Sequence, residues 1–202
     1  LLPYGIRMWD DAAFVRQATG FNYDNQDLGL EVGLEPGPFS VAVALSNGSQ
    51  GAADDNKAKQ VSVVGSYWSR LVVVGASAAY NDARGIERMV VGPFASLRTG
   101  PLTWTGEVDR ISDSGGIDND QVVGFASLDF WYRQAVNVRL AFDYHDPFDG
   151  VDEDERSRVS LGFDAFLTPF LSASAYYRSA DSVPQDMAGN ADRLTVSLHS
   201  FF

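Results

Sequence analysis

Charged side chains recur at alternate positions through much of this sequence. Alternate residues of an extended chain share one face, so acidic and basic groups at this spacing would collect on a common wall. Such a wall could line a water-filled path, with charge placement setting selectivity. Alternatively, its members could pair across the interior and fill it. The candidates for this wall are the carboxylates Glu31, Glu35, Glu107, Asp109, Asp129, Asp143 and Asp164 and the guanidiniums Arg98, Arg133, Arg139, Arg158, Arg178 and Arg193.

Two other patterns carry chemistry, and each has a simpler structural interpretation. His145-Asp146 could belong to a hydrolytic dyad, but a nucleophile would have to lie nearby in space, and a solvated or structural role is favoured. The acidic run over 146–155 has oxygen ligands that suit Ca²⁺, yet its spacing is not that of an EF-hand, which favours a solvated acidic rim. The sequence has no glycine-rich phosphate loop, nucleotide motif or haem-attachment motif. We therefore expect no enzyme activity, no metal site and no cofactor.

Composition narrows the class of protein. The chain has 202 residues and a net charge of −12, which argues against a nucleic-acid partner because phosphate binding needs clustered Lys and Arg. It contains no cysteine, which excludes disulfides and thiolate metal sites. No stretch reaches the roughly 18 to 20 apolar residues that a membrane helix needs. If this chain crosses a membrane, it does so with strands.

From Leu28 onward the dominant period is two, which predicts β-strands. In 136–145, for example, apolar Leu140 and Phe142 alternate with polar Arg139 and Asp143. Pro93 lacks a ladder donor and predicts a bulge or a strained edge. Strict alternation is found in 28–35, 39–46, 71–81, 102–109, 136–145, 158–167 and 193–202, and a looser form in 61–69, 89–98, 122–133 and 171–178.

The predicted connections alternate between short and long. Tight turns are expected at 35–38, 69–71, 98–101, 132–135 and 167–170, and longer polar loops near 46–60, 81–88, 112–121, 145–157 and 179–192. Outer-membrane barrels have short periplasmic turns and long external loops, and strands of about ten residues cross a bilayer with tilt.

Aromatic residues gather near the predicted strand ends, as in the two interfacial girdles of a membrane barrel. A soluble barrel or sandwich would alternate in the same way, but turn asymmetry and girdles together favour the membrane. The residues expected to face lipid are Val72, Val74, Leu140, Phe142, Val159, Leu161, Leu194 and Val196. The aromatic residues are Phe39, Tyr67, Trp68, Trp104, Trp131, Tyr132 and Phe170 near the short turns and Tyr80, Tyr144 and Tyr177 near the long loops.

The predicted fold is an antiparallel up-and-down transmembrane β-barrel in the outer membrane, with 1–202 forming a single domain. A strand at 3–9 would bring this chain to about 12 strands, the usual even number. Leu2-Pro3-Tyr4-Gly5-Ile6-Arg7, followed by Ala13-Phe14-Val15-Arg16 and later by Asp27-Leu28-Gly29-Leu30-Glu31-Val32-Gly33, resembles a mid-chain segment of the phosphate-selective porin O and P family. The resemblance covers about the first 50 residues and implies a channel fold. Residues 1–27 would then be a first strand with its external loop, or a mid-chain segment of a larger barrel.

The final segment, 193–202, resembles the C-terminal signal of outer-membrane proteins. Leu194, Val196, Leu198 and Phe202 lie at alternate positions, although Ser200 departs from the pattern. The resemblance implies recognition by the barrel-assembly machinery. In addition, the last strand must pair with a neighbour, because an open edge in lipid leaves backbone groups unsatisfied.

Three functions follow from this fold as hypotheses. The leading one is a porin-like channel for passive passage of small polar or charged solutes. The alternatives are a barrel that sheathes a partner protein, such as an electron-transfer cytochrome, and a small barrel enzyme of the outer leaflet. Expected partners are outer-membrane lipid and lipopolysaccharide, a second copy of the chain, or a periplasmic or extracellular protein.

Overall fold

The computed structural model describes residues 13–20, 27–48, 59–83, 85–116, 118–133, 135–183 and 186–200. Within these ranges no helix is long and apolar enough to cross a membrane. The elements are the helix α1 (Phe14–Thr19) and the strands β1 (Gly29–Leu34), β2 (Phe39–Ser46), β3 (Gln60–Trp68), β4 (Val72–Ala83), β5 (Ile86–Thr99), β6 (Leu102–Ser114), β7 (Asn119–Tyr132), β8 (Val136–Asp146), β9 (Arg156–Thr168), β10 (Leu171–Asp181) and β11 (Arg193–Ser200).

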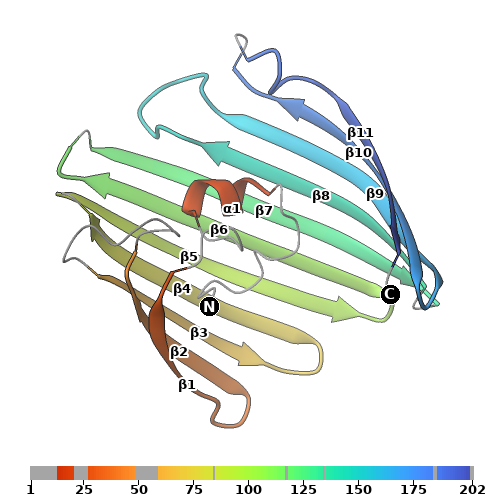
Figure 1. Ribbon diagram of the computed structural model, residues 1–202, viewed down its shortest axis with the longest axis horizontal. Coiled ribbons are helices and arrows are strands. Elements are labelled where there is room, and N and C mark those ends of the chain that lie inside the picture. The colour runs from red at the N-terminus through yellow and green to blue at the C-terminus, as the bar shows by residue number, and fades with distance from the viewer. Residues whose placement is uncertain are drawn as a thin grey trace.

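The strands form one 11-stranded sheet in which each strand pairs with its neighbours in sequence order (Figure 1). Every pairing is antiparallel, which confirms the predicted up-and-down fold. β1 and β11 lie at the two edges of the sheet. The predicted strand at 3–9 and the terminal Phe202 lie outside the described residues, so the twelfth strand and closure by the last segment stay predictions.

The two faces of the sheet differ in chemistry, and the predicted alternation is confirmed. On the outer face, Leu140 and Phe142 of β8 are exposed, whereas Arg139 and Asp143 between them are buried on the inner face. The same outward exposure is found for Val74, Val159, Leu161, Leu194 and Val196, and Val72 shares this face through its pairing with Leu97. An apolar outer face of this extent suits hydrocarbon rather than water.

The helix α1 lies against β6, β7 and β8 on the inner face (Figure 1). Ala13 and Val15 are buried there in a core with Ile111, Val123 and Phe125. A helix of six residues is not stable alone, so this packing must hold it. It ends at Gly20, whose φ of 75° is the left-handed conformation that glycine adopts without strain.

Aromatic side chains mark both ends of the outer face, but two members of the predicted girdles, Trp68 and Trp131, take inner-face positions in β3 and β7. Near the short turns, the rings of Phe39 and Tyr67 lie 5.4 Å apart on adjacent strands, and Trp104 is exposed. Near the other end, Tyr80 and Tyr177 are exposed on the same outer face. This arrangement agrees with the two interfacial belts of a membrane barrel.

The predicted alternation of loop lengths is only partly correct. Long connections separate β2 from β3, β8 from β9, and β10 from β11. At 81–88 and 112–121, by contrast, the strands continue and the connections are short. The polar residues there pair across strands instead of forming loops: Asn81 is opposite Arg88, and Arg88 is opposite Asp113. Polar residues at the strand ends therefore do not indicate a loop here, and the predicted loops at 81–88 and 112–121 are wrong.

Pro93 lies inside β5 without a bulge or an edge, contrary to the sequence prediction. It pairs with Ala76 of β4. On the β6 side the pairing lapses at Gly92 and Pro93, but the register is the same before and after them. The missing N–H of proline therefore interrupts the hydrogen-bonding between β5 and β6 locally but does not shift the register of the two strands.

Candidate functional site

The inner wall over β6 to β9 concentrates buried charge, and the alternation of these strands places it there. Glu107 and Asp109 of β6, Asp129 of β7 and Asp143 of β8 are each at most 2% exposed. The guanidiniums of Arg139 and Arg158 are buried on the same face. Burying a charged side chain costs much free energy unless the charge is paired and hydrogen-bonded. The partners of these buried charges therefore define the site.

Asp129 and Arg139 form an ion pair between neighbouring strands. They are direct partners across the β7–β8 ladder, and Nε of Arg139 lies 2.8 Å from Oδ1 of Asp129. Asn137 donates a hydrogen bond to the same oxygen, and Ser127 donates one to Oδ2. The carboxylate is thus held from several sides, which fixes it against the wall.

Asp143 and Arg158 form a second pair of the same kind across β8 and β9. The guanidinium donates from both Nε and Nη2 to Oδ2 of Asp143, at 3.1 and 2.9 Å. The other carboxylate oxygen accepts a hydrogen bond from the backbone N–H of Phe14, at 3.2 Å. Arg158 also lies over the Phe14 ring, 4.8 Å from its centroid. This pair therefore binds the start of α1 as well as the two strands.

The end of α1 is held by a charge of the opposite sign. Arg88 of β5 donates from Nη2 to the carbonyl oxygen of Ala18, at 2.7 Å, and its Nε lies 3.7 Å from Asp113. A carboxylate at the N-terminus and a guanidinium at the C-terminus both complement the helix dipole. The wall thereby fixes a short helix inside the curve of the sheet.

Glycines on the inner face make room for side chains of adjacent strands. A Cβ at Gly92 would overlap the carboxylate of Asp109, and one at Gly162 would overlap the ring of Tyr176. Lying over Gly162, Tyr176 donates its hydroxyl hydrogen bond to Asp164. Because these glycines have no side chain, the polar side chains of the adjacent strand can lie flat against the inner wall.

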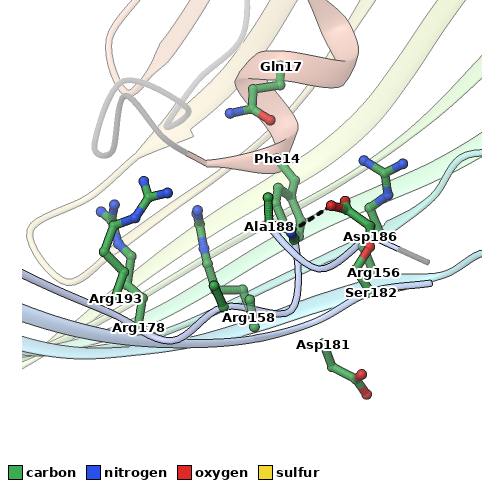
Figure 2. Close-up of a pocket in the computed structure, with 13 residues that line it drawn as sticks. Phe14, Gln17, Arg156, Arg158, Arg178, Asp181, Ser182, Asp186, Ala188 and Arg193 are labelled. Carbon is green, nitrogen blue, oxygen red and sulfur yellow. Dashed lines mark hydrogen bonds between the residues drawn. The ribbon is translucent and has the colours of Figure 1, made fainter. Parts of the chain in front are cut away.

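A cavity of about 200 Å³ lies between α1 and the inner wall of β9 to β11 (Figure 2). Arg158, Arg178 and Arg193 point to the side on which α1 lies, and Asp181 points away from it (Figure 2). The rest of the lining comes from Phe14, Gln17, Arg156, Ala180, Ser182, Asp186, Ala188, Gly189 and Ala191.

The predicted wall residues divide into three groups. On β6 to β9, the buried wall is shared by Glu107, Asp109, Asp129, Arg139, Asp143 and Arg158, whereas Asp164 is half-buried and accepts a hydrogen bond from Tyr176. Arg178 and Arg193 join Arg158 at the cavity. Glu31 of β1 and Arg98 of β5 lie on inner-face positions away from this cluster. Glu35 and Arg133 lie in short turns rather than in strands, and the Arg133 guanidinium is 5.2 Å from the centroid of the Tyr132 ring. The pore-lining role of the whole set stays a prediction.

Sequence reasoning missed several members of this site. The sequence predicts loops for the segments that hold Phe14, Gln17 and Arg88, yet Arg88 continues the inner face of β5 with Val90. Extending the period of two beyond the predicted strand end would have found Arg88. No comparable signal exists for α1, because a single helical turn carries too little periodicity.

The remaining chemical candidates have local partners. The ring of His145 shares a hydrogen bond with Gln121 and lies 6.4 Å from the Phe14 ring, measured between centroids. Asp146 accepts a hydrogen bond from the backbone N–H of Phe148. The structure thus gives each residue of the proposed dyad a structural partner.

The loops beyond the strands are acidic. In the described residues, no group of three or more His, Asp or Glu side chains is placed to hold a metal ion. Burial and the nearby Asp146 and Glu155 raise the pKa of Asp154. Hydrogen bonds from Tyr177 and Ser179 lower the pKa of Asp192. These loops therefore contain both repelling and locally satisfied carboxylates.

Solved structures share this architecture. A porin aligns with a TM-score of 0.70 and 16% identity, over 87% of this chain and 62% of the porin. An anion-selective porin from Comamonas acidovorans gives 0.68 and 13%, over 85% and 58%. OmpT, an outer membrane protein of Vibrio cholerae in its trimer form, gives 0.71 and 12%, over 97% and 68%.

The likeness at these identities concerns the fold, which is that of outer-membrane porins. The chain spans about three fifths of the length of the two porins. No family model matches the sequence, and no curated protein matches it.

Proposed function

We propose that the protein lies in the outer membrane and forms a channel for passive passage of small polar or charged solutes. One observation carries the proposal: the same strands present exposed apolar side chains on the outer face and buried charged side chains on the inner face. This is the division expected of strands that separate hydrocarbon from a polar lumen.

The position of α1 gives the channel a narrow region. The helix lies on the inner wall rather than outside the sheet, and its two ends are tied to Asp143 and Arg88. The cavity beside it is lined by both polar and apolar groups. A solute that follows the wall of β9 to β11 would pass between α1 and the arginines.

The wall charges that pair along the sheet are compatible with such a path. Asp129–Arg139 and Asp143–Arg158 join adjacent strands and do not reach across the interior. Pairing of this kind fixes charges to the wall without filling the lumen. The alternative of pairing across the interior is therefore not needed to satisfy these four groups.

The membrane and assembly partners are part of the proposal. The apolar outer face would contact lipid, with lipopolysaccharide at the acidic external rim, and β11 would carry the signal for the barrel-assembly machinery. A homo-oligomer is also proposed, as is kinship with the phosphate-selective porin O and P family. Residues 1–12, which carry much of that resemblance, lie outside the described residues.

Reconstitution of the full-length protein tests the channel. We expect stepwise single-channel currents in planar bilayers and swelling of proteoliposomes in small sugars. Protein that has lost its heat-modifiable gel migration serves as the unfolded control. Folded protein that gives neither currents nor swelling would reject the channel and favour a sheath around a partner protein or an enzyme.

A further inference from the structure

The two ends of the strands carry opposite charge. Exposed carboxylates gather at the long-loop end, whereas the short turns at the other end carry three exposed arginines (Figure 1). Among the described residues of the short turns, Glu35 is the one carboxylate. The arginines are Arg70, Arg98 and Arg133, and the exposed carboxylates of the long-loop end include Asp118, Asp149, Asp152, Glu153, Glu155, Asp181 and Asp192. The two ends of the sheet therefore suit different partners.

Backbone hydrogen bonds hold the three arginine-bearing turns side by side. The N–H of Arg98 donates to the carbonyl oxygen of Leu71 in the β3–β4 turn, at 2.7 Å. The N–H of Trp131, near the end of β7, donates to the carbonyl oxygen of Pro101 in the β5–β6 turn, at 2.9 Å. The three positive charges thus lie in a row along the short-turn end of the sheet, which we call the basic rim.

The basic rim has no counter-charge in the described part of the chain. None of its three guanidiniums forms an ion pair with a described residue. Like charges held in neighbouring turns repel each other, so an anionic partner would stabilise this end of the sheet. The rim therefore has a positive potential that an external group has to balance.

Arg133 lies at a backbone position that favours glycine. Its φ of 49° is the left-handed conformation, which glycine adopts freely and larger residues rarely adopt. Its guanidinium is 5.2 Å from the centroid of the Tyr132 ring, and Tyr132 is exposed on the outer face. The charge of Arg133 is therefore held on the lipid-facing side of the rim. Because the turn itself does not require an arginine, the side chain has a role of its own.

We propose that Arg70 and Arg133 bind the phosphate groups of anionic phospholipids in the leaflet that the short turns meet. The guanidinium fork matches phosphate oxygens with parallel hydrogen bonds. Trp104 is exposed on the outer face at the same end of the sheet, and interfacial aromatic rings lie at the level of the lipid head groups. Arg98, on an inner-face position, adds to the positive potential of the rim. The lipid site rests on the membrane location of the proposed channel.

Quenching of tryptophan fluorescence by brominated lipids measures this preference on the full-length protein in vesicles. Among the described residues, Trp104 is the one tryptophan on the outer face. The quenching is compared between brominated phosphatidylglycerol, which is anionic, and brominated phosphatidylcholine, which is zwitterionic. We expect a roughly threefold to fivefold preference for phosphatidylglycerol at low salt. In about 1 M salt the preference should disappear, because the charges are screened.

Inorganic phosphate distinguishes a lipid site from a site for the free ion. Added in excess at constant ionic strength, it should leave the preference for phosphatidylglycerol unchanged, because the head groups are held at the rim by the membrane. Loss of the preference under these conditions would show a site for free phosphate and overturn the lipid assignment.

The variants separate the rim from net charge. Arg133→Gly removes the charge and suits the backbone, so the protein should fold while the preference falls roughly twofold. Arg70→Gln with Arg133→Gly should abolish the preference, and Arg70→Lys with Arg133→Lys should retain part of it, because the charge is kept without the fork. Arg110→Gln, at the long-loop end of the outer face, is the matched control for loss of one positive charge. Heat-modifiable gel migration verifies that each variant is folded.

The outcomes for the lipid site and the channel are distinguishable. A preference for phosphatidylglycerol in protein that shows no channel currents would reject the channel and retain the lipid site. Channel currents with equal quenching by both lipids, or an equal preference in wild type and Arg70→Gln with Arg133→Gly, would overturn the lipid site and leave the channel standing. An equal loss in Arg110→Gln would also overturn it. Folded protein that neither lipid quenches would reject the membrane location on which both proposals depend.

Discussion

Arg158 donates two hydrogen bonds to the same carboxylate oxygen of Asp143, its direct partner across the β8–β9 ladder. The second oxygen accepts the backbone N–H of Phe14 at the start of α1. One carboxylate therefore joins two strands and a helix that lies more than a hundred residues earlier in the chain. Because the helix is too short to be stable alone, its position in the lumen depends on this group.

Asp143→Asn should loosen α1 and destabilise the fold. Breaking a buried ion pair by removing one partner costs about 3–5 kcal/mol, since Arg158 is left charged and uncompensated. We expect the free energy of unfolding in urea to fall by that order, and single-channel conductance to rise or fluctuate as the helix leaves the wall. Asp152→Asn, in the exposed loop after β8, is the control. Unchanged conductance and stability would show that Asp143 does not hold α1.

Arg88→Gln should release the other end of the helix. Its hydrogen bond to the Ala18 carbonyl involves a charged donor, and bonds of this kind contribute about 1.5–3 kcal/mol. If Arg88 and Asp143 hold one element, their effects on conductance will not be additive, because the first release already frees it. A double-mutant cycle on unfolding and conductance measures the coupling. Strictly additive effects would show that the two contacts act on separate parts of the structure.

Arg139→Gln should affect stability far more than ion selectivity. The sequence treats Arg139 and Arg178 alike, as wall charges whose loss shifts selectivity toward cations. In the structure Arg139 is 7% exposed and bound to Asp129, so it contributes little to the potential that a passing ion meets. We expect a loss of about 3–5 kcal/mol in unfolding free energy, with a nearly unchanged reversal potential in asymmetric KCl. A shift as large as that of Arg178→Gln would contradict the burial.

Leu140→Arg tests the outer face. Leu140 is exposed on β8, and an arginine facing hydrocarbon near mid-membrane costs about 2–4 kcal/mol. Leu140→Phe keeps the position apolar and should be tolerated. Cysteine placed at this position should react slowly with water-soluble maleimides in intact membranes. Fast labelling there would show that the outer face meets water, and the membrane assignment would fail.

The sequence predicts the faces of this sheet well, because the period of two is a local property. Leu140 outside and Arg139 inside follow from neighbouring residue types alone. The connection lengths follow less well, since Asn81 and Arg88 are polar yet pair within the ladder. The type of a residue indicates whether it can face water, but it does not indicate where the hydrogen-bonding between two strands ends.

The contacts of the site depend on register and on tertiary packing, which local patterns do not encode. Alternation places Asp143 and Arg158 on the same face, but their pairing follows from the β8–β9 register. The helix α1 is defined by burial of Val15 against Ile111 and Val123, contacts between residues about a hundred positions apart. The arginine cavity needs both the register and α1, so it could not be derived from the sequence.

Gly162→Ala tests whether glycine is required where Tyr176 lies over the wall. An added Cβ would overlap the Tyr176 ring, so the ring would have to move and lose its hydrogen bond to Asp164. Overpacking of this kind costs about 1–3 kcal/mol. Gly106→Ala is the matched control, because on the outer side of β6 the atom nearest to its Cβ would be the Phe125 carbonyl oxygen at 3.6 Å. We expect the control to be neutral in urea unfolding. Combining Gly162→Ala with Tyr176→Ser should recover only part of the loss, because the ring is removed but the Ala175 carbonyl oxygen would still lie 2.6 Å from the added Cβ. If Gly162→Ala alone is as stable as wild type, the close approach of Tyr176 to the wall is not part of the folded state.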